Sequence, residues 1–497
     1  MEKEPGILVS EVRMAIDSLK KNKAVGIDGI SAEEIQAATT EKGSVVLHQL
    51  CQSMWDSERV PDEWKKAIIV PIHKKKDKMD CNNYRGVSIL CHCSKVYSNI
   101  LLRRMRKRTD EILAEEQAGF RAQRNTTEQI FVLRQVVEKY TEMNKDLFVG
   151  YIDFRKAFDS IWRRGLWRVM RNLGFAEKLV KILENMYEGT YSAVRSSGGL
   201  SEWFETIVGV KQGCILSPLL FNIFLEAIMS QALRDGEEGA VIGGYLISNL
   251  RFADDIAGLG ETREALDRLM CRISLEAEKL GMSVNVDKTE VQCIGQDQQI
   301  INVAINGKKL NQVEEFVYLG GVITSEGKSD KDVKRRIGFA SGVMSSLKVI
   351  WQARDISLGT KVMVYESLVL SLLLYNSETW TLREDTKQRL RVFEMGCLRR
   401  ILGVTRRDRI RNAHVRERLN LSTDIVQRVA ERRLRFFGHV VRMPAHRLPL
   451  VAIQGQVHGK RSRGRPQKRW IDNVKEDVTT MGISLVEAFR LTQDREG

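Results

Sequence analysis

Two adjacent acids, Asp254 and Asp255, lie in a stretch where apolar and small residues alternate around them. The stretch LISNLRFADDIAGLG predicts two short strands with the acids in or beside the turn between them. Like charges at this spacing repel each other, and a divalent cation relieves that repulsion. Asp153 ends another apolar run, FVGYIDF, and is the candidate for a third ligand. The alternative interpretation is that the adjacent pair are ordinary solvated acids of a turn.

Three carboxylates at strand ends suit one particular chemistry, the in-line transfer of a phosphoryl group. They could hold two Mg²⁺ ions about 3.5–4 Å apart, which activate an attacking hydroxyl and stabilise the leaving oxygen. Oxygen ligands suit Mg²⁺, which keeps water and substrate phosphates in its remaining positions. Mn²⁺ is the alternative ion.

The elements that must position these acids form a mixture of strands and helices, so we expect an α+β protein. The apolar run DLFVGYIDF predicts a buried strand, and SVNVDKTEVQCIG and EEFVYLGGVIT predict further strands. Ser217 and Pro218 predict the start of a helix. Another helix is expected from Glu264 to about Leu280, and from about residue 330 onward the pattern is helical throughout.

The 497-residue chain has a formal net charge of +15, and its positive charge is concentrated towards the C-terminus. Between Arg399 and Lys475 there are 21 Lys and Arg residues but only 5 Asp and Glu residues, so the rest is nearly neutral. This asymmetry favours a polyanionic partner such as nucleic acid. A solvated helical face is the alternative explanation.

Cysteine usage and hydropathy argue against secretion and membrane insertion. The eight cysteines are scattered, form no paired CxxC set and indicate reduced intracellular thiols. The N-terminal residues lack a signal-peptide pattern, and the longest apolar run, LVLSLLLY from Leu368, is too short to span a bilayer. We therefore expect a protein of the nucleus or cytoplasm with no membrane partner. The oligomeric state is not indicated by the sequence.

Three stretches, DFRKAFD, GVKQGCILSPLLFNIFLEAI and FADDI, resemble in this order the motifs of reverse transcriptases from non-LTR, long-interspersed-element-like retrotransposons. Five more stretches fit the same family, namely GIDGI, NYRGVSIL, EEQAGFRAQRNTTEQI, LGMSVNVDKTEV and FVYLGGVIT. The resemblance covers about residues 15–330, and so many ordered motifs are far more specific than any one alone. It implies a right-hand polymerase with fingers, a palm containing an antiparallel sheet, and a helical thumb.

The resemblance also implies a division of the chain into five parts. These are an N-terminal helical extension over residues 1–60, fingers over 61–145, a palm over 146–330, a helical thumb over 331–425 and a basic nucleic-acid-binding region over 426–497. Such retrotransposon proteins usually carry a nicking endonuclease ahead of the polymerase. The short lead before GIDGI leaves no room for one, so we expect this chain to lack it.

Metal and sugar contacts follow from the resemblance residue by residue. Asp153 and Asp254 would be the principal ligands of two Mg²⁺ ions, with Asp255 adjacent and the carbonyl of Phe154 assisting. Phe158 falls where the family places an aromatic ring under the sugar of the incoming nucleotide. A ring there would clash with a ribose 2′-OH and favour dNTPs. Plain core packing is the alternative for Phe158.

The remaining assignments concern the triphosphate, the template and the primer. Arg85 is the candidate triphosphate clamp, with a structural salt bridge as its alternative. Gln212 and Gly213 would approach the template–primer, where glycine permits close backbone contact. Lys288 is the candidate proton donor to the departing pyrophosphate, and an exposed lysine at a strand end is the alternative. The residues assigned to the grip on the primer end are Tyr318 and Gly320.

The expected reaction is the RNA-templated addition of dNTPs to the 3′-OH of a DNA primer. One alternative is a catalytically silent nucleic-acid-binding remnant or domesticated copy, which the expected lack of an endonuclease and the basic C-terminal region would suit. The other is an RNA-dependent RNA polymerase, against which Phe158 argues.

Overall fold

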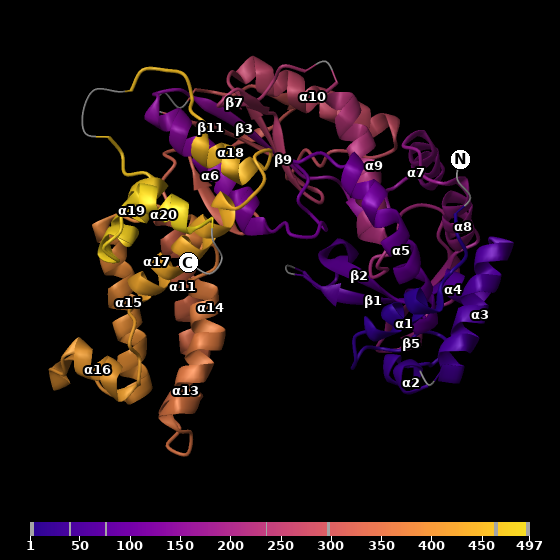
Figure 1. Cartoon of the computed structure of the whole chain (residues 1–497), viewed down its shortest axis with the longest axis horizontal. Helices are drawn as coiled ribbons and strands as arrows, with labels where there is room; N and C mark the ends of the chain where they lie inside the picture. The colour runs from indigo at the N-terminus through magenta and orange to yellow at the C-terminus, as the bar shows by residue number, and fades with distance from the viewer. Residues whose placement is uncertain are drawn as a thin grey trace. The chain divides into compact units, whose positions relative to one another are not determined.

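The computed structural model describes residues 4–38, 41–74, 77–234, 236–295, 299–461 and 466–493. They form two compact units, each built from three stretches of the chain (Figure 1). Unit 1 comprises the described residues of Met1–Gln123, Asp153–Gly236 and Leu269–Asn285. Unit 2 comprises those of Arg124–Ile152, Glu237–Arg268 and Val286–Gly497.

Unit 1 combines a helical framework with a five-stranded sheet. In this sheet β1 pairs antiparallel with β2 and parallel with β4, and β4 also pairs with β5 and β6. The strands are β1 (Lys66–His73), β2 (Tyr84–Ile89), β4 (Tyr191–Ser196), β5 (Gly199–Leu200) and β6 (Phe204–Glu205). The helices and short 3-10 turns are α1 (Val9–Asp17), α2 (Ala32–Ala37), α3 (Glu41–Ser57), α4 (Asp62–Lys65), η1 (Cys81–Asn83), α5 (His92–Ile112), η2 (Ala157–Asp159), α7 (Arg163–Asn172), α8 (Glu177–Tyr187) and α9 (Ser217–Ala232).

Helix α9 is largely buried within unit 1, as expected from its sequence SPLLFNIFLEAIMSQA, which is apolar around most of its circumference. Its predicted start at Ser217 and Pro218 is confirmed, and proline is well placed in the first turn because no backbone donor is needed there. The Ser217 hydroxyl does not cap the helix, however. It donates instead to the carbonyl oxygen of Lys211 at 2.8 Å and so ties the preceding loop to the helix.

Unit 2 is built on a second five-stranded sheet with the order β14–β11–β3–β10–β9. Every pairing is antiparallel except that between β11 and β14. All six residues of the central strand β3, LFVGYI, are buried, as the apolar run predicts. The strands are β3 (Leu147–Ile152), β9 (Asn249–Phe252), β10 (Asp255–Gly260), β11 (Glu290–Ile294) and β14 (Asn311–Gln312).

Helix α6 (Thr126–Glu142) covers this sheet and shares a hydrophobic core with β3, β9 and β10. Helix α18 (Leu448–Gln454) lies beside α6 (Figure 1). Asn125 caps α6 by accepting a hydrogen bond from the backbone N–H of Glu128 at 2.9 Å. The smaller sheets of unit 2 are β7 (Ala240–Ile242) with β8 (Tyr245–Ile247), β12 (Ala304–Ile305) with β13 (Lys308–Lys309), and β15 (Glu315–Tyr318) with β16 (Gly321–Thr324).

The chain after β16 is helical, as its pattern predicts. Its elements are α11 (Asp330–Ser346), α12 (Lys348–Gln352), α13 (Leu358–Val364), the π-helical η3 (Tyr365–Leu370), α14 (Ser371–Leu373), η4 (Ser377–Thr379), α15 (Glu384–Leu402), η5 (Arg406–Asp408), α16 (Asn412–Arg418), α17 (Ile425–Val441), α18, α19 (Trp470–Thr480) and α20 (Leu485–Leu491). Helix α10 (Arg263–Lys279) begins in unit 2 and ends in unit 1.

A separate aromatic core joins the C-terminal helices to α6. Phe131 of α6 meets Phe436 of α17 at 5.0 Å and Trp470 of α19 at 4.8 Å between ring centroids. Aromatic pairs in such edge-to-face arrangements add stability beyond the area that they bury. The C-terminal helices are therefore part of the fold of unit 2.

The predicted α+β class is confirmed by this mixture of helices and largely antiparallel sheets. None of the helices within the described ranges combines the length and apolar character needed to cross a lipid bilayer.

Candidate active site

The β9–β10 hairpin of unit 2 carries the two adjacent acids at its turn. Phe252, the last residue of β9, pairs with Asp255, the first residue of β10. Only Ala253 and Asp254 lie between them, and Ala253 has a left-handed φ of 57°, as the tightest hairpin turns require. The predicted pair of strands with the acids in and beside the turn is confirmed.

The register of the sheet brings the end of β3 to the same edge as this turn. Ile152, the last residue of β3, pairs with Ile256, the second residue of β10. Asp153 is the next residue along the chain and begins a stretch of unit 1. Within the described ranges, no three His, Cys, Asp or Glu side chains form a ready-made metal-binding group. Metal binding by these acids therefore stays a prediction.

Asp153 makes two hydrogen bonds to Asn285 within unit 1. The backbone N–H of Asn285 donates to the Asp153 carbonyl oxygen at 2.7 Å, and its Nδ2 donates to Oδ2 of the carboxylate at 2.9 Å. The two hydrogen bonds fix both the backbone and the carboxylate of Asp153. Asn285 lies in LGMSVNVDKTEV, but sequence reasoning did not single it out.

Phe154, predicted as a carbonyl ligand, faces Val284 in the same short antiparallel pairing. The hydrogen bonds flank this pair, since the Arg155 N–H donates to the Ser283 carbonyl at 3.0 Å and Asn285 donates as described. In such a pair the carbonyls point away from the partner strand. The Phe154 carbonyl is therefore not used in this pairing.

Phe158 lies in η2 and is half-buried within unit 1. Its ring stacks on Phe221 of α9, with centroids 4.6 Å apart and planes 14° apart. The ring of Phe120 meets it at 89° and 6.2 Å. The Val210 N–H donates to the Phe158 carbonyl at 2.8 Å. Core packing therefore explains the buried part of the Phe158 side chain but not its exposed part. The sequence did not indicate the two rings that contact it, Phe120 and Phe221.

Gln212 and Gly213 lie in a loop that closes onto β2. The Ser88 N–H donates to the Gln212 carbonyl at 2.6 Å, and Gln212 Nε2 donates to Oδ1 of Asp159 at 2.9 Å. Gly213 has a φ of 119°, and a Cβ atom there would lie 2.5 Å from the Ser88 carbonyl oxygen. Only glycine fits this position, because it alone tolerates both the dihedral and the approach.

Arg85 on β2 belongs to a group of cations around Asp159. Burial by surrounding atoms raises the pKa of the Asp159 carboxyl, although the side chain reaches solvent. The hydrogen bond from Gln212 and the charges of Lys156, Lys74 and Arg85 oppose this rise. Three cations around one carboxylate leave positive charge in excess, which suits a polyphosphate. Sequence reasoning missed Lys74 and Asp159, although Asp159 ends DFRKAFD.

The β15–β16 hairpin of unit 2 holds the predicted primer-grip residues. Tyr318 is only 2% exposed, and its hydroxyl donates to the Leu250 carbonyl on β9 at 3.2 Å. Burial and the nearby charge of Asp255 raise the pKa of the Tyr318 hydroxyl well above its ordinary value. The Tyr318 side chain therefore supports the acid-bearing hairpin from inside.

Lys288, the predicted proton donor, is exposed and lies shortly before β11.

Gly320 occupies the turn of this hairpin with a φ of 86°. Its carbonyl oxygen accepts hydrogen bonds from Arg336 and, at 3.3 Å, from Arg335, both on α11. The Tyr375 hydroxyl donates to the neighbouring Leu319 carbonyl at 3.0 Å. Side chains of the following helical region thus hold the turn in place.

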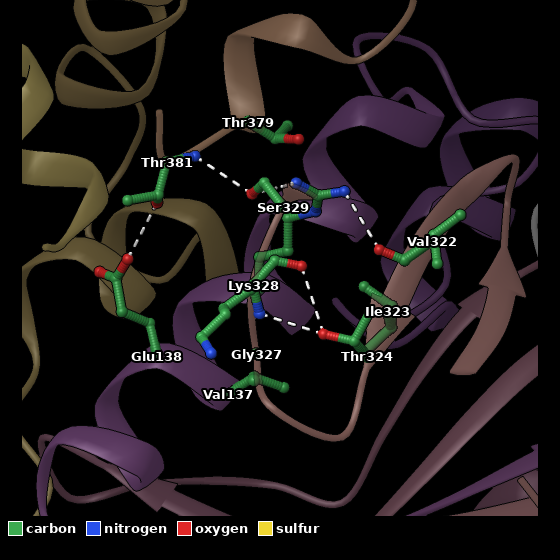
Figure 2. Close-up of a pocket in the computed structure, with 11 residues that line it drawn as sticks. Val137, Glu138, Val322, Ile323, Thr324, Gly327, Lys328, Ser329, Thr379 and Thr381 are labelled. Atoms are coloured by element: carbon green, nitrogen blue, oxygen red, sulfur yellow. Dashed lines mark hydrogen bonds between the residues drawn. The ribbon is translucent and has the colours of Figure 1, made fainter. Parts of the chain in front are cut away.

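A small cavity of unit 2 lies between α6, β16 and the segment around Thr381 (Figure 2). Its volume of about 10 Å³ has room for about one water molecule, far too little for a substrate. Glu138 at its edge accepts hydrogen bonds from Thr381 Oγ1 at 3.2 Å and from the Trp470 N–H at 2.8 Å. Burial raises the pKa of Glu138 to about 7, although both hydrogen bonds oppose the rise.

The predicted basic region over residues 426–497 uses several arginines internally. Arg433 is 1% exposed and pairs with Asp477 at 2.7 Å, and Arg447 pairs with Glu128 of α6 at 2.6 Å. Four exposed arginines just before this region make no ion pair with any described residue. They form the arginine loop, Arg406, Arg407, Arg409 and Arg411.

Residues 72–323 match the sequence model of a family described as reverse transcriptase (RNA-dependent DNA polymerase). The RNA-directed DNA polymerase from mobile element jockey of Drosophila melanogaster is 26% identical over 414 residues, covering 80% of this chain and 44% of that protein. The probable RNA-directed DNA polymerase from transposon X-element of the same species is 24% identical, covering 92% and 50%. The chain thus spans about half the length of these relatives. Apo telomerase from Candida tropicalis is similar at a TM-score of 0.43 and 12% identity, covering 97% of this chain and 83% of that one.

Proposed function

Because the chain belongs to the reverse transcriptase (RNA-dependent DNA polymerase) family, we propose that it is a retrotransposon-derived RNA-directed DNA polymerase. It extends the 3′-OH of a DNA primer with dNTPs on an RNA template. The observation that carries the proposal is the register of the unit 2 sheet, in which the end of β3, just before Asp153, lies beside the start of β10 at Asp255. Both strands lie inside the region that matches the family.

Reverse transcriptases generally use divalent metal ions. The proposed ligands of these ions in this chain are Asp153, Asp254 and Asp255. Carboxylate oxygens suit Mg²⁺, and also Mn²⁺. Two bound ions would lower the pKa of the primer hydroxyl and stabilise the charge on the leaving oxygen. Asn285 supports the proposal, because a carboxylate whose oxygen is already hydrogen-bonded is oriented before a metal arrives.

The nucleotide would be bound by residues of unit 1. The positive excess formed by Lys74, Arg85 and Lys156 suits the triphosphate. Phe158 would lie under the sugar and exclude a ribose 2′-OH. Gln212, whose amide is held by Asp159, would orient the template–primer through the loop that Gly213 closes.

The primer end would contact the turn of the β15–β16 hairpin rather than the Tyr318 side chain, which is buried. Gly320 allows a close backbone approach there.

Lys288 would donate a proton to pyrophosphate, because it is an exposed cation near the strand ends. The arginine loop would add contacts to nucleic-acid phosphates, and the protein would work in the nucleus or cytoplasm.

Primer extension on a primed RNA with dNTPs and Mg²⁺ tests the proposal. We expect extension by the wild type, and a loss of at least about a thousandfold for Asp254→Asn, because a ligand charge of the two-metal centre is removed. Asp355→Asn is the matched control, since Asp355 is an exposed acid outside the matched region. The proposal fails if the wild type does not extend the primer, or if Asp254→Asn extends it equally well. Salt-sensitive binding without extension would indicate a silent nucleic-acid-binding copy instead.

A further inference from the structure

Phe120 is a large apolar side chain that remains 50% exposed beside Phe158 in unit 1. Its ring is perpendicular to that of Phe158, at 89° and 6.2 Å between centroids. Phe221, which is fully buried, stacks on the same ring at 4.6 Å. Phe158 is thus held by one ring from the core and by a second ring that faces solvent.

The backbone around Phe120 is fixed by hydrogen bonds from two buried side chains. Phe120 has a left-handed φ of 59°, a conformation that costs free energy for any side chain with a Cβ atom. The preceding residue, Gly119, accepts a hydrogen bond at 2.7 Å from Nδ2 of Asn222, and its N–H donates to Oε1 of the buried Gln117 at 2.9 Å. These contacts hold the strained residue where its ring meets Phe158.

Two consecutive residues of α9 position the rings of Phe158 and Phe120. Phe221 stacks on Phe158, and Asn222, the next residue, holds the loop that presents Phe120. Asn222 is 1% exposed, and its Nδ2 is shielded from water while it makes this hydrogen bond. A half-exposed aromatic ring held so firmly is better explained by a ligand contact than by core packing.

We propose that Phe120 is a specificity-determining residue that holds the ring of Phe158 in place and forms a second wall of the pocket for the nucleotide sugar. This inference rests on the proposed function, in which Phe158 lies under the sugar. A ring excludes a 2′-OH only if it does not move aside. Phe120 supplies the contact that prevents this movement on the solvent side.

The test compares kcat/KM for a dNTP and for the matching rNTP on the same primed RNA. In Phe120→Ala we expect the preference for the dNTP to fall roughly two- to tenfold, which is the worth of one edge-to-face aromatic contact. The fall in preference should come mainly from a higher kcat/KM for the rNTP. Phe204→Ala is the matched control, because Phe204 is also a half-exposed phenylalanine of unit 1 and makes no ring contact with Phe158.

A double-mutant cycle separates a positioning role from a general loss of structure. Phe158→Ala alone should lower the preference, and Phe120→Ala should then lower it by less than it does in the wild type, since part of the effect of Phe120 is transmitted through the ring of Phe158. Phe120→Leu, which keeps apolar bulk without an aromatic edge, serves if the alanine variant does not fold.

Two further outcomes would overturn the inference. A wild type that extends primers while Phe120→Ala and Phe120→Leu keep its full preference contradicts this inference alone. A wild type that incorporates no nucleotide contradicts the proposed function and this inference with it.

Discussion

Asn285 Nδ2 donates a hydrogen bond to Oδ2 of Asp153 at 2.9 Å, while the backbone N–H of the same residue donates to the Asp153 carbonyl at 2.7 Å. A metal-binding carboxylate that is anchored in this way loses less conformational entropy when an ion arrives. The side-chain hydrogen bond joins the residue that follows β3 to a residue 132 positions further along the chain.

The first prediction concerns this hydrogen bond. We expect Asn285→Ala to reduce extension about 10- to 100-fold and to raise the Mg²⁺ concentration needed for half-maximal rate, because a metal ligand without its supporting hydrogen bond is less well oriented. Mn²⁺ binding measured by electron paramagnetic resonance should weaken in parallel. Asn172→Ala, at an exposed position of unit 1, is the control. Unchanged metal dependence in Asn285→Ala would contradict the proposed positioning.

The second prediction concerns the loop at Gly213. Gly213→Ala should destabilise unit 1 by about 2 kcal/mol or more, because a left-handed non-glycine residue costs about 1–2 kcal/mol and the clash with the Ser88 carbonyl adds to it. Gly189→Ala is the control, since Gly189 also has a positive φ but no atom within 4 Å of an added Cβ. Urea unfolding measures both. Equal destabilisation by the two variants would show that the close approach to Ser88 has no cost.

The third prediction is a pH dependence of stability that arises from Glu138. Its pKa of about 7 in the folded protein lies above the ordinary value of 4.5, so the folded state binds the proton more tightly than the unfolded state. This contribution to stability is present at low pH and is lost as the pH rises from about 5 to about 7, by at most about 3 kcal/mol.

Unfolding by urea at pH 5 and pH 8 measures this effect. Glu138→Gln should flatten the difference between the two pH values relative to wild type, because the amide does not titrate. Glu431→Gln, at an exposed position on α17, should leave the difference unchanged. If Glu138→Gln keeps the wild-type difference in stability between pH 5 and pH 8, the difference arises from other groups and the prediction is wrong.

The fourth prediction concerns the arginine loop. Replacing Arg406 and Arg407 with glutamine should weaken binding to single-stranded RNA and lower the slope of log affinity against log salt by about 0.7 for each phosphate that the variant no longer neutralises. The control pair is Arg164→Gln with Arg168→Gln, which removes the same charge from exposed positions of α7. Fluorescence anisotropy at several salt concentrations distinguishes them. Equal slopes for the two double variants would exclude a direct role of the loop in RNA binding.

Local sequence patterns predicted much of the fold around the candidate site. Alternation around Asp254 and Asp255 predicted the hairpin, and the apolar run before Asp153 predicted β3, because these patterns report burial directly. The ordered motifs predicted membership of the reverse transcriptase family, and the match over residues 72–323 confirms it. That membership also confirms the predicted right-hand polymerase class.

Contacts between distant segments could not be predicted in this way. Nothing local to Asn285 or Phe120 indicates a partner, because each meets its partner only through the tertiary fold. Tyr318 is an example of the same limit, since its place in FVYLGG indicated a primer contact, whereas its ring is buried under β9. Net charge does not reveal which charged residues form ion pairs within the protein either. Arg433 and Arg447 belong to the basic region, yet both form internal ion pairs. The five-part division of the chain and the expected lack of an endonuclease stay predictions.

The aromatic contacts of Phe131 have a consequence for how the protein is made. Phe436 and Trp470, the rings that cover Phe131, are encoded more than three hundred residues after it. During synthesis on the ribosome, this face of α6 therefore stays uncovered until the chain has been translated through Trp470. Copies of the gene interrupted by a stop codon before Trp470 would yield products with an exposed aromatic surface, which chaperones and proteases recognise.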